Sequence, residues 1–137
     1  MKTVFADSLY WIAVVRPNDA WGDAANAARK ALGDAFILST DEVLSEFLAA
    51  LSHGGETLRR QAAKMVRAIL SNPNVRVIPQ SRDSFLRGLE LYELRGDKEY
   101  SLTDCISMNA MKSQSVNEIL TNDHHFAQEG FSILIKK

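Results

Sequence analysis

Short apolar runs alternate along the chain with longer segments in which apolar residues recur every three or four positions. Five runs have the length and composition of buried strands: Thr3–Ala6, Phe36–Ser39, Val75–Ile78, Glu118–Thr121 and Ser132–Ile135. The longer segments predict helices over Leu9–Val15, Ala20–Leu32, Asp41–His53, Glu56–Leu70, Arg82–Arg95 and Thr103–Ser113. Because strands separated by helices pair in parallel through right-handed crossovers, the pattern predicts a doubly wound α/β fold of about five mainly parallel strands flanked by helices.

The predicted helices carry residues that commonly start and stop helices. Asn18 or Asp19 is placed to cap the helix over Ala20–Leu32, and Gly33 follows its last residue. Gly96 follows the helix Arg82–Arg95 in the same way. These positions support the division of the chain into separate helices.

Two aspartates stand where such a fold places its ligand site. In open parallel sheets, ligands bind at the carboxyl ends of the strands, near the point where the strand order reverses. Asp7 follows the first strand and interrupts the otherwise almost continuously apolar stretch VFADSLYWIAVV. Asp123, in ILTND, follows the fourth strand. We therefore expect these two carboxylates to face the same site.

Two further acids share helix faces with apolar residues. Glu46 follows the helical spacing of Val43 and Phe47, so it is expected to point with the core residues. Asp104 belongs to a similar stripe with Met108, near the amino end of its helix. Its carboxylate should project from the top of the apolar face.

Four carboxylates in such positions are costly unless something neutralises them. A carboxylate isolated in a low dielectric takes up a proton, and neighbouring carboxylates repel one another. A divalent cation relieves both problems, and an all-oxygen ligand set favours Mg²⁺ or Mn²⁺ over zinc. The chain has no Cys/His cluster, which agrees with that preference.

Each acid taken alone also has an ordinary structural explanation. Asp7 could cap the helix that follows it, and Glu46 could pair with a nearby arginine. Asp123 could form an Asx turn as the chain leaves its strand, and Asp104 could be an early-turn acid of its helix. The joint placement of the four favours a metal site.

Composition agrees with a single globular domain over residues 1–137. The hydrophobic content is 46%, charged residues make up 24%, and Cys105 is the only cysteine, so no intrachain disulfide can form. No apolar run approaches membrane-spanning length, and the amino-terminal segment lacks the cleavage pattern of a signal peptide. A cytoplasmic protein is the expectation.

The net charge of −1 argues against a general nucleic-acid coat protein. Metal binding would change that balance. If four of the 17 acids bound metal, the 16 Lys and Arg residues would exceed the remaining 13 acids by three. The charge therefore leaves RNA binding open.

Four segments in order and spacing resemble the PIN domain family, particularly its small VapC-type members, the toxins of bacterial toxin–antitoxin pairs. These segments are VFADSLYWIAVVRPNDAWGDAA, STDEVLSEFLAAL, YSLTDCISMNAM and ILTNDHHFAQEGF. The resemblance implies a Rossmann-like three-layer sandwich with an acidic pocket and the activity of an Mg²⁺- or Mn²⁺-dependent ribonuclease. The family's catalytic, metal-binding acids correspond to Asp7, Glu46, Asp104 and Asp123.

Roles can be assigned to these residues as a hypothesis. Asp7 and Asp104 would be direct metal ligands, Glu46 would bind metal or act as general base, and Asp123 would hold a second metal or its waters. Ser8 occupies the place where the family often has a hydroxyl beside the first acid. Water or phosphate oxygens would be oriented by Thr121 and Asn122. Trp21 stands where relatives often show a histidine.

The resemblance also implies partners. The substrate would be RNA, and single-stranded RNA is held by cations and by aromatic stacking. Arg95, Lys98 and Tyr100 are candidates for this, although solvated surface charge is the simpler explanation for the two cations. An antitoxin protein and a second copy in a homodimer are further expected partners. The apolar face of the Glu56–Leu70 helix could serve either of them or the core.

Several residues are expected to be structural. His125 is predicted to be a structural residue on a loop and His124 to be exposed, while Cys105 should be a buried small hydrophobe. Five aromatic side chains are expected in the core: Phe5, Trp11, Phe36, Phe47 and Phe126.

Other carboxylate-containing folds fit less well. A phospho-receiver needs an acidic pair after the first strand, where Ser8 stands, and an aspartate after the third, where Pro79 and Gln80 stand. A haloacid-dehalogenase phosphatase needs a second aspartate at the place of Leu9. The remaining alternative is a PIN scaffold that binds RNA without cleaving it.

Overall fold

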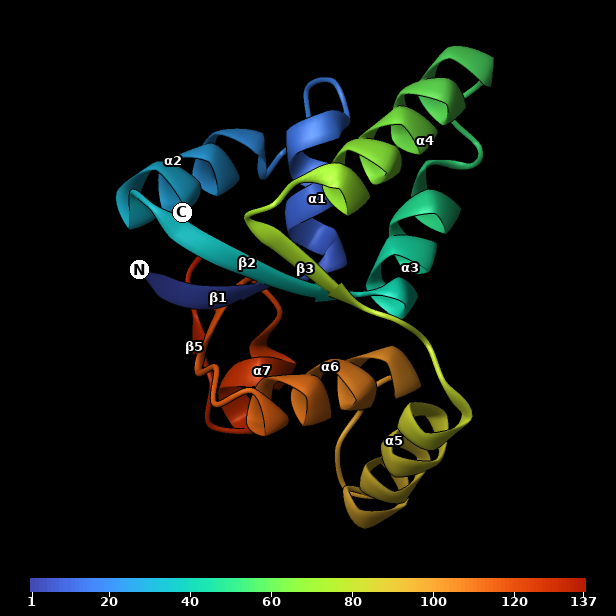
Figure 1. Ribbon diagram of the computed structural model, residues 1–137, viewed down its shortest axis with the longest axis vertical. Helices are drawn as coiled ribbons and strands as arrows, with labels where there is room; N and C mark the ends of the chain where they lie inside the picture. The colour runs from blue at the N-terminus through green and yellow to red at the C-terminus, as the bar shows by residue number, and fades with distance from the viewer.

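A five-stranded parallel sheet forms the centre of the computed structural model, which describes residues 1–137 (Figure 1). Its strands are β1 (Lys2–Ala6), β2 (Ala35–Thr40), β3 (Val75–Ile78), β4 (Glu118–Leu120) and β5 (Ser132–Ile133). They lie in the order β3-β2-β1-β4-β5, and every neighbouring pair is parallel. The predicted parallel sheet is confirmed.

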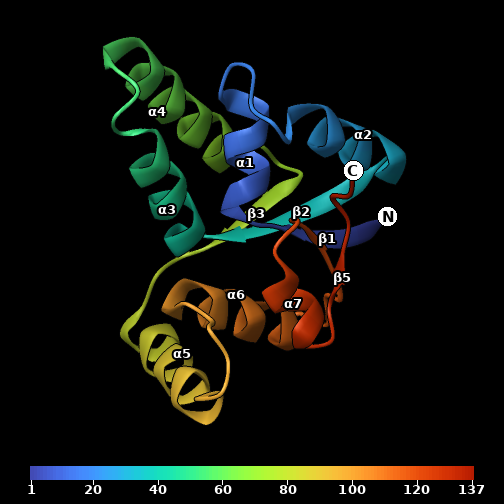
Figure 2. The same ribbon diagram turned by 180° about the vertical axis from the view of Figure 1, so that it is seen from behind.

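Helices cover both faces of the sheet and complete a three-layer sandwich. One face carries α1 (Ser8–Val15), α2 (Gly22–Leu32), α3 (Asp41–Leu51) and α4 (Glu56–Ser71). The other carries α5 (Arg82–Leu94), α6 (Leu102–Ser113) and α7 (His124–Gln128). The view from behind shows the same division, with both termini on the side of α2 (Figure 2). No helix is both long and apolar enough to cross a membrane.

The strand order reverses between β1 and β4. The first crossovers run from β1 outward to β2 and β3 on one face, whereas the chain then returns to β4 on the other side of β1. Register fixes the two strands at this point, since Phe5 is paired with Ile119 and Ala6 with Leu120. The residues that follow β1 and β4 therefore emerge side by side.

The start of α2 differs from the sequence prediction, and α7 was not predicted. α2 begins at Gly22 with Trp21 as its N-cap residue, so the predicted capping role of Asn18 or Asp19 is wrong. Asn18 instead has a positive φ of 57°, and Asp19 Oδ1 accepts a hydrogen bond from the Trp21 backbone N–H at 2.8 Å. Those polar residues form the turn before the helix.

The core is a cluster of 26 buried hydrophobic residues. The predicted core positions of Phe5, Trp11, Phe47 and Phe126 are confirmed, as is the burial of Cys105. The prediction for Phe36 is wrong, because its side chain is 42% exposed. Side chains alternate between the faces of a strand, and Phe36 faces away from buried Ile37 near the amino end of β2.

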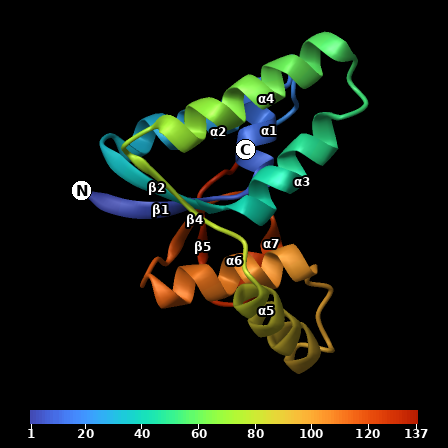
Figure 3. The same cartoon turned by 45° about the vertical axis from the view of Figure 1, so that its right-hand side comes forward.

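α5 lies at the end of the molecule opposite α4 and packs on α6 (Figure 3). Gly88 allows the two helices to approach closely, since a Cβ atom at this position would lie 2.6 Å from Ile106 Cγ1. Five large apolar side chains of α5 are exposed: Phe85, Leu86, Leu89, Tyr92 and Leu94.

Candidate active site: an acidic cleft

A cleft of about 490 Å³ opens beside the carboxyl ends of β1 and β4. Six acids line it: Asp7, Asp19, Glu46, Glu99, Asp104 and Asp123. The four acids predicted from the sequence are therefore brought together from distant parts of the chain. Arg16 is the one lysine or arginine among the lining residues, so the cleft has a strong excess of negative charge.

Asp7 is the most deeply buried of these acids, with 5% of its surface exposed. Its Oδ2 accepts a hydrogen bond of 2.9 Å from Thr121 Oγ1. Burial raises the pKa of the Asp7 carboxyl to about 7, and the nearby charges of Glu46 and Asp104 act in the same direction. Although Asp7 precedes α1, its side chain makes no capping hydrogen bond, so the structure does not support a helix-cap role.

Glu46 reaches the cleft from α3 and is half-buried. Its Oε1 accepts a hydrogen bond from Ser8 Oγ, whose side chain is buried beside Asp7. Neither lysine nor arginine forms an ion pair with Glu46, so the alternative of an arginine partner is not supported. The hydroxyl of Ser8 holds Glu46 at the base of the cleft.

Asp104 and Asp123 each use one carboxylate oxygen to begin a helix. Asp104 Oδ2 accepts the Ser101 backbone N–H at 3.1 Å in the capping box of α6. Asp123 Oδ1 accepts the His125 backbone N–H at 2.9 Å at the start of α7. The ordinary helix-start explanations are therefore correct for one oxygen of each residue. They account for only half of each carboxylate.

The four predicted acids share one bonding pattern. In each, a single oxygen accepts hydrogen bonds from hydroxyl, backbone or imidazole groups, and the second oxygen has no protein partner: Asp7, Glu46, Asp104 and Asp123. None is paired with lysine or arginine. Only two fully buried polar side-chain atoms lack a hydrogen-bond partner, one in Trp11 and one in Ser107. The free carboxylate oxygens are not among them, so they are accessible to solvent. Such a donor set fits a hard divalent cation.

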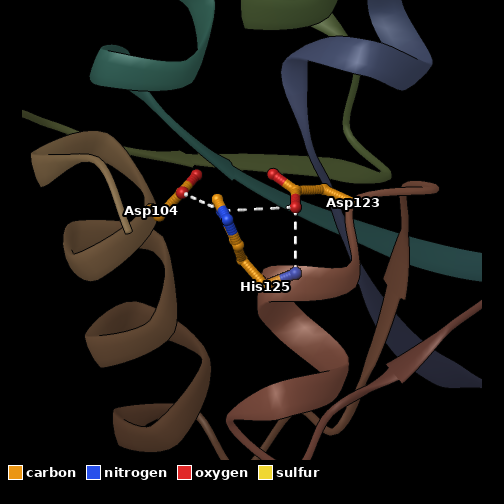
Figure 4. Close-up of side chains that lie close together, drawn as sticks. All are labelled: Asp104, Asp123 and His125. Carbon is orange, nitrogen blue, oxygen red and sulfur yellow. Dashed lines mark hydrogen bonds and ion pairs between the residues drawn. The ribbon is translucent and has the colours of Figure 1, made fainter. Parts of the chain in front are cut away.

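His125 lies between two of the acids (Figure 4). Its Nδ1 is 3.1 Å from Asp104 Oδ2 and 3.4 Å from Asp123 Oδ1. One ligand atom from each of the three residues falls within 4.8 Å of the others, close enough to share an ion. The predicted loop position of His125 is wrong, because α7 begins at His124 and brings the ring over the cleft. The predicted exposure of His124 is confirmed.

A family comparison accounts for this arrangement. The sequence model of the PIN domain matches residues 4–131. The chain belongs to the PIN domain family. The predicted family and PIN-like fold are confirmed, and the phospho-receiver and phosphatase alternatives are excluded. No curated protein matches the sequence significantly.

Solved PIN-domain structures share the fold at low sequence identity. VapC20 of Mycobacterium tuberculosis, described as a sarcin–ricin loop cleaving toxin, is 23% identical with a TM-score of 0.81, over 93% of this chain and 95% of that one. VapBC2 of Rickettsia felis, solved with a fragment of promoter DNA, is 16% identical with a TM-score of 0.64, over 97% and 96%. FitAcB from Neisseria gonorrhoeae is 14% identical with a TM-score of 0.63, over 98% of this chain and 96% of that one.

The remaining predicted residues of this PIN domain lie in different places. Ser8 lines the cleft, and Thr121 lies directly beneath it, fully buried. Asn122 turns away, because its Nδ2 donates to the Ile135 carbonyl at 3.2 Å. Neither Arg95 nor Lys98 lines the cleft.

Those two cations already have intramolecular partners. Arg95 forms a bidentate pair with Glu129, and Lys98 lies 3.7 Å from Asp97. Tyr100 is buried and donates its hydroxyl hydrogen to Glu129, so it offers no open ring face to a base. The stacking role predicted for Tyr100 is therefore wrong.

Sequence reasoning missed several residues that line the cleft. Arg16 and Trp21, together with Leu9 and Ile12, line the cleft beside Asp19. Trp21 was noted only as standing where the family resemblance implies a histidine, and no RNA role was assigned to it from the sequence. A larger cavity of about 790 Å³ lies between β3, α5 and α6, but none of the four predicted acids lines it.

Proposed function

We propose that this PIN domain is an endoribonuclease that uses Mg²⁺ or Mn²⁺ to hydrolyse phosphodiester bonds in single-stranded or structured RNA. The observation that carries the proposal is the group of four carboxylates without a lysine or arginine partner, each with one free oxygen at the cleft. Family membership and the RNA-loop cleavage described for VapC20 support the same chemistry.

The residues present fit a divalent cation. Asp7 and Asp104 would be its direct ligands, with Glu46 and Asp123 as further ligands or as holders of its waters. When bound, the cation would neutralise phosphate charge and lower the pKa of the attacking water. With the cation bound, the pKa of Asp7 would fall, so its carboxyl would be ionised despite its burial.

Hydroxyl groups fix the acids in place. Thr121 Oγ1 donates to Asp7 Oδ2 and accepts the Asp123 backbone N–H at 3.1 Å, so it links the residues after β1 and β4. Ser8 holds Glu46 in the same manner. Because one oxygen of each acid is restrained, the free oxygen keeps a defined direction. Glu46, which is less buried than Asp7, would bind the metal or accept the proton of an attacking water.

Arg16 and Trp21, which line the cleft beside Asp19, support contact with RNA. Arg16 Nη1 lies 3.6 Å from Asp19 Oδ2, and its side chain is 43% exposed, so its charge can reach a phosphate. Half-buried Trp21 provides an aromatic surface in the same cleft, with Lys137 Nζ 4.3 Å from its ring centroid as a further cation. These two cleft-lining residues are stronger candidates for RNA contact than Arg95, which does not line the cleft and forms a bidentate pair with Glu129.

A direct test compares cleavage and metal binding. The purified protein is incubated with a mixed set of single-stranded and hairpin RNAs, with Mg²⁺, Mn²⁺ or a chelator, and metal binding is measured by calorimetry. Metal-dependent cleavage that Asp7→Asn abolishes is expected. Metal or RNA binding without any cleavage would favour the alternative of a non-catalytic RNA-binding scaffold.

We also propose that the protein is the toxin of a type II toxin–antitoxin pair. VapC20 is described as a toxin, and this chain shares its fold over almost its whole length. The resemblance to VapC-type sequences supports the same assignment. Expression alone should arrest growth, and co-expression with the adjacent reading frame should restore it. Growth unaffected by the active protein would contradict the toxin assignment.

The predicted homodimer has a candidate surface on α5. α4, the helix whose apolar face was considered for a partner, buries Ala62 and Ile69 in the core. In contrast, α5 exposes Phe85, Leu86 and Leu89. Since a cluster of large exposed apolar side chains commonly marks an interface, we propose that two copies associate through α5.

A further inference from the structure

Glu129 is a buried acid outside the cleft with an unusually complete set of partners. Its side chain is 6% exposed, and the residue directly follows α7. Arg95 donates to both of its oxygens at 2.9 Å, Tyr100 Oη donates to Oε1 at 3.0 Å, and Lys112 Nζ donates to Oε2 at 3.1 Å. Three separate segments therefore converge on one carboxylate.

The charges of this group are firmly set. The hydrogen bonds from Arg95 hold the pKa of Glu129 at about 2, against the opposing effect of burial. Burial, followed by the hydrogen bond to Glu129, raises the pKa of Tyr100 to about 12. Glu129 is thus a permanent anion at neutral pH, and the Tyr100 hydroxyl is a permanent donor to it.

Tyr100 connects this group to the acidic cleft. Its ring packs on the imidazole of His125, with a centroid separation of 5.5 Å and an interplanar angle of 56°. The His125 ring in turn contacts Asp104 and Asp123. Tyr100 also immediately precedes Ser101, whose backbone N–H binds Asp104. A displacement of Tyr100 would therefore disturb Asp104 both through His125 and through Ser101.

We propose that Glu129 and Tyr100 are positioning residues that fix the His125 ring between Asp104 and Asp123 and thereby set the spacing of these two carboxylates for the metal. The inference rests on the proposed metal-dependent function. A purely structural alternative is that Glu129 only ties the segment before α6 to α7. The proposal and this alternative differ in whether weakening the contacts of Glu129 changes the position of the His125 ring and the metal affinity of the cleft.

The experiment uses Glu129→Gln and Tyr100→Phe in the full chain, with Glu56→Gln as a matched control. Glu56 makes an exposed ion pair with Arg60, far from any cleft contact, so its loss removes a charge without touching the network. The His125 ring is followed by NMR in metal-free protein, with His53 and His124 as internal references. Mn²⁺ affinity is measured by calorimetry.

Glu129→Gln is expected to shift or broaden the His125 ring signals and to weaken Mn²⁺ binding by about 10-fold or more, the usual effect of losing an outer-shell partner. Tyr100→Phe keeps the ring but releases it from Glu129, so it should act in the same direction and more weakly. Because both act through one contact, the double variant should be less than additive.

Unchanged Mn²⁺ affinity in folded variants would overturn the proposal, even with a lowered melting temperature. If Glu129→Gln does not fold, the proposal is tested with Tyr100→Phe through the His125 ring signals and the Mn²⁺ affinity. Wild-type protein that binds no Mn²⁺ would refute the proposed metal-dependent function instead. In that case the His125 signals would still show whether Glu129 and Tyr100 position the ring.

Discussion

Thr121 Oγ1 donates a 2.9 Å hydrogen bond to Asp7 Oδ2 across 114 residues of sequence. Both residues directly follow strands of the sheet, β1 and β4, which are neighbours only because the strand order reverses there. The same hydroxyl accepts the backbone N–H of Asp123. One side chain thus holds two acids of the cleft in register, and it makes Asp7 the natural first target for mutation.

Asp7→Asn should abolish RNA cleavage while leaving the fold intact. The amide is nearly isosteric with the carboxyl and can still accept from Thr121, but it carries no charge for a metal. We expect a loss of at least 100-fold in kcat with an unchanged far-UV circular dichroism spectrum, comparable with losses on removing one electrostatic catalytic group. Retained metal-dependent cleavage would contradict the assignment of Asp7 as a ligand.

Metal-free wild-type protein should lose stability relative to Asp7→Asn as the pH rises from about 4 to about 7. The pKa of Asp7 is about 7 in the folded protein and 3.8 in an ordinary carboxyl, so the folded state binds the extra proton in this window. Ionisation above pH 7 therefore costs the folded state on the order of 4 kcal/mol.

This prediction is checked by urea unfolding with chelator at pH 5 and pH 8. The free energy of unfolding of Asp7→Asn relative to that of the wild type should be higher at pH 8 than at pH 5. Saturating Mg²⁺ should reduce the difference by stabilising the wild type alone. A difference independent of pH would show that the Asp7 carboxyl titrates normally.

Trp21→Ala should weaken RNA binding by about 5- to 100-fold, the range expected when one base loses its aromatic stacking partner. Binding is measured by fluorescence anisotropy in the Asp7→Asn background, so that cleavage does not interfere. The chain has two tryptophans, and Trp11 is 5% exposed. RNA should therefore quench the fluorescence of Trp21 and leave that of Trp11 unchanged.

Leu86→Lys on α5 should convert a homodimer into a monomer. The side chain is 47% exposed, so the substitution places a charge in the proposed interface without disturbing the core. Leu70→Lys on α4 is the matched control, since Leu70 is 57% exposed on another helix. Light scattering gives the molar mass. A wild-type mass of one chain, or a dimer that survives Leu86→Lys, would contradict the proposed surface.

The sequence predicted the sheet and the meeting of the acids correctly because both depend on local signals. Alternation of apolar runs with helical periodicity gave parallel pairing, and polar residues after β1 and β4 marked the switch point. Glu46 was recognised from its helix face alone, and the structure places it in the cleft with Asp7. The predicted start of α2 was wrong, because Asn18 and Asp19 belong to the turn before the helix and do not cap it.

Long-range partners were not predictable in the same way. Arg95 has the sequence features of an RNA-binding cation, yet the fold gives it Glu129, 34 residues away. His125 was assigned to a loop because a five-residue helix is too short to show periodicity, whereas the capping oxygen of Asp123 starts α7 there.

The sequence by itself determined the layers of the fold and the four acids that share its cleft, because spacing along a strand or helix fixes which side chains point inward. Tertiary structure alone decided which charges are already neutralised, which helix keeps an uncovered apolar face, and where His125 lies. Those properties depend on what packs against each face, and a local pattern does not specify its own partner.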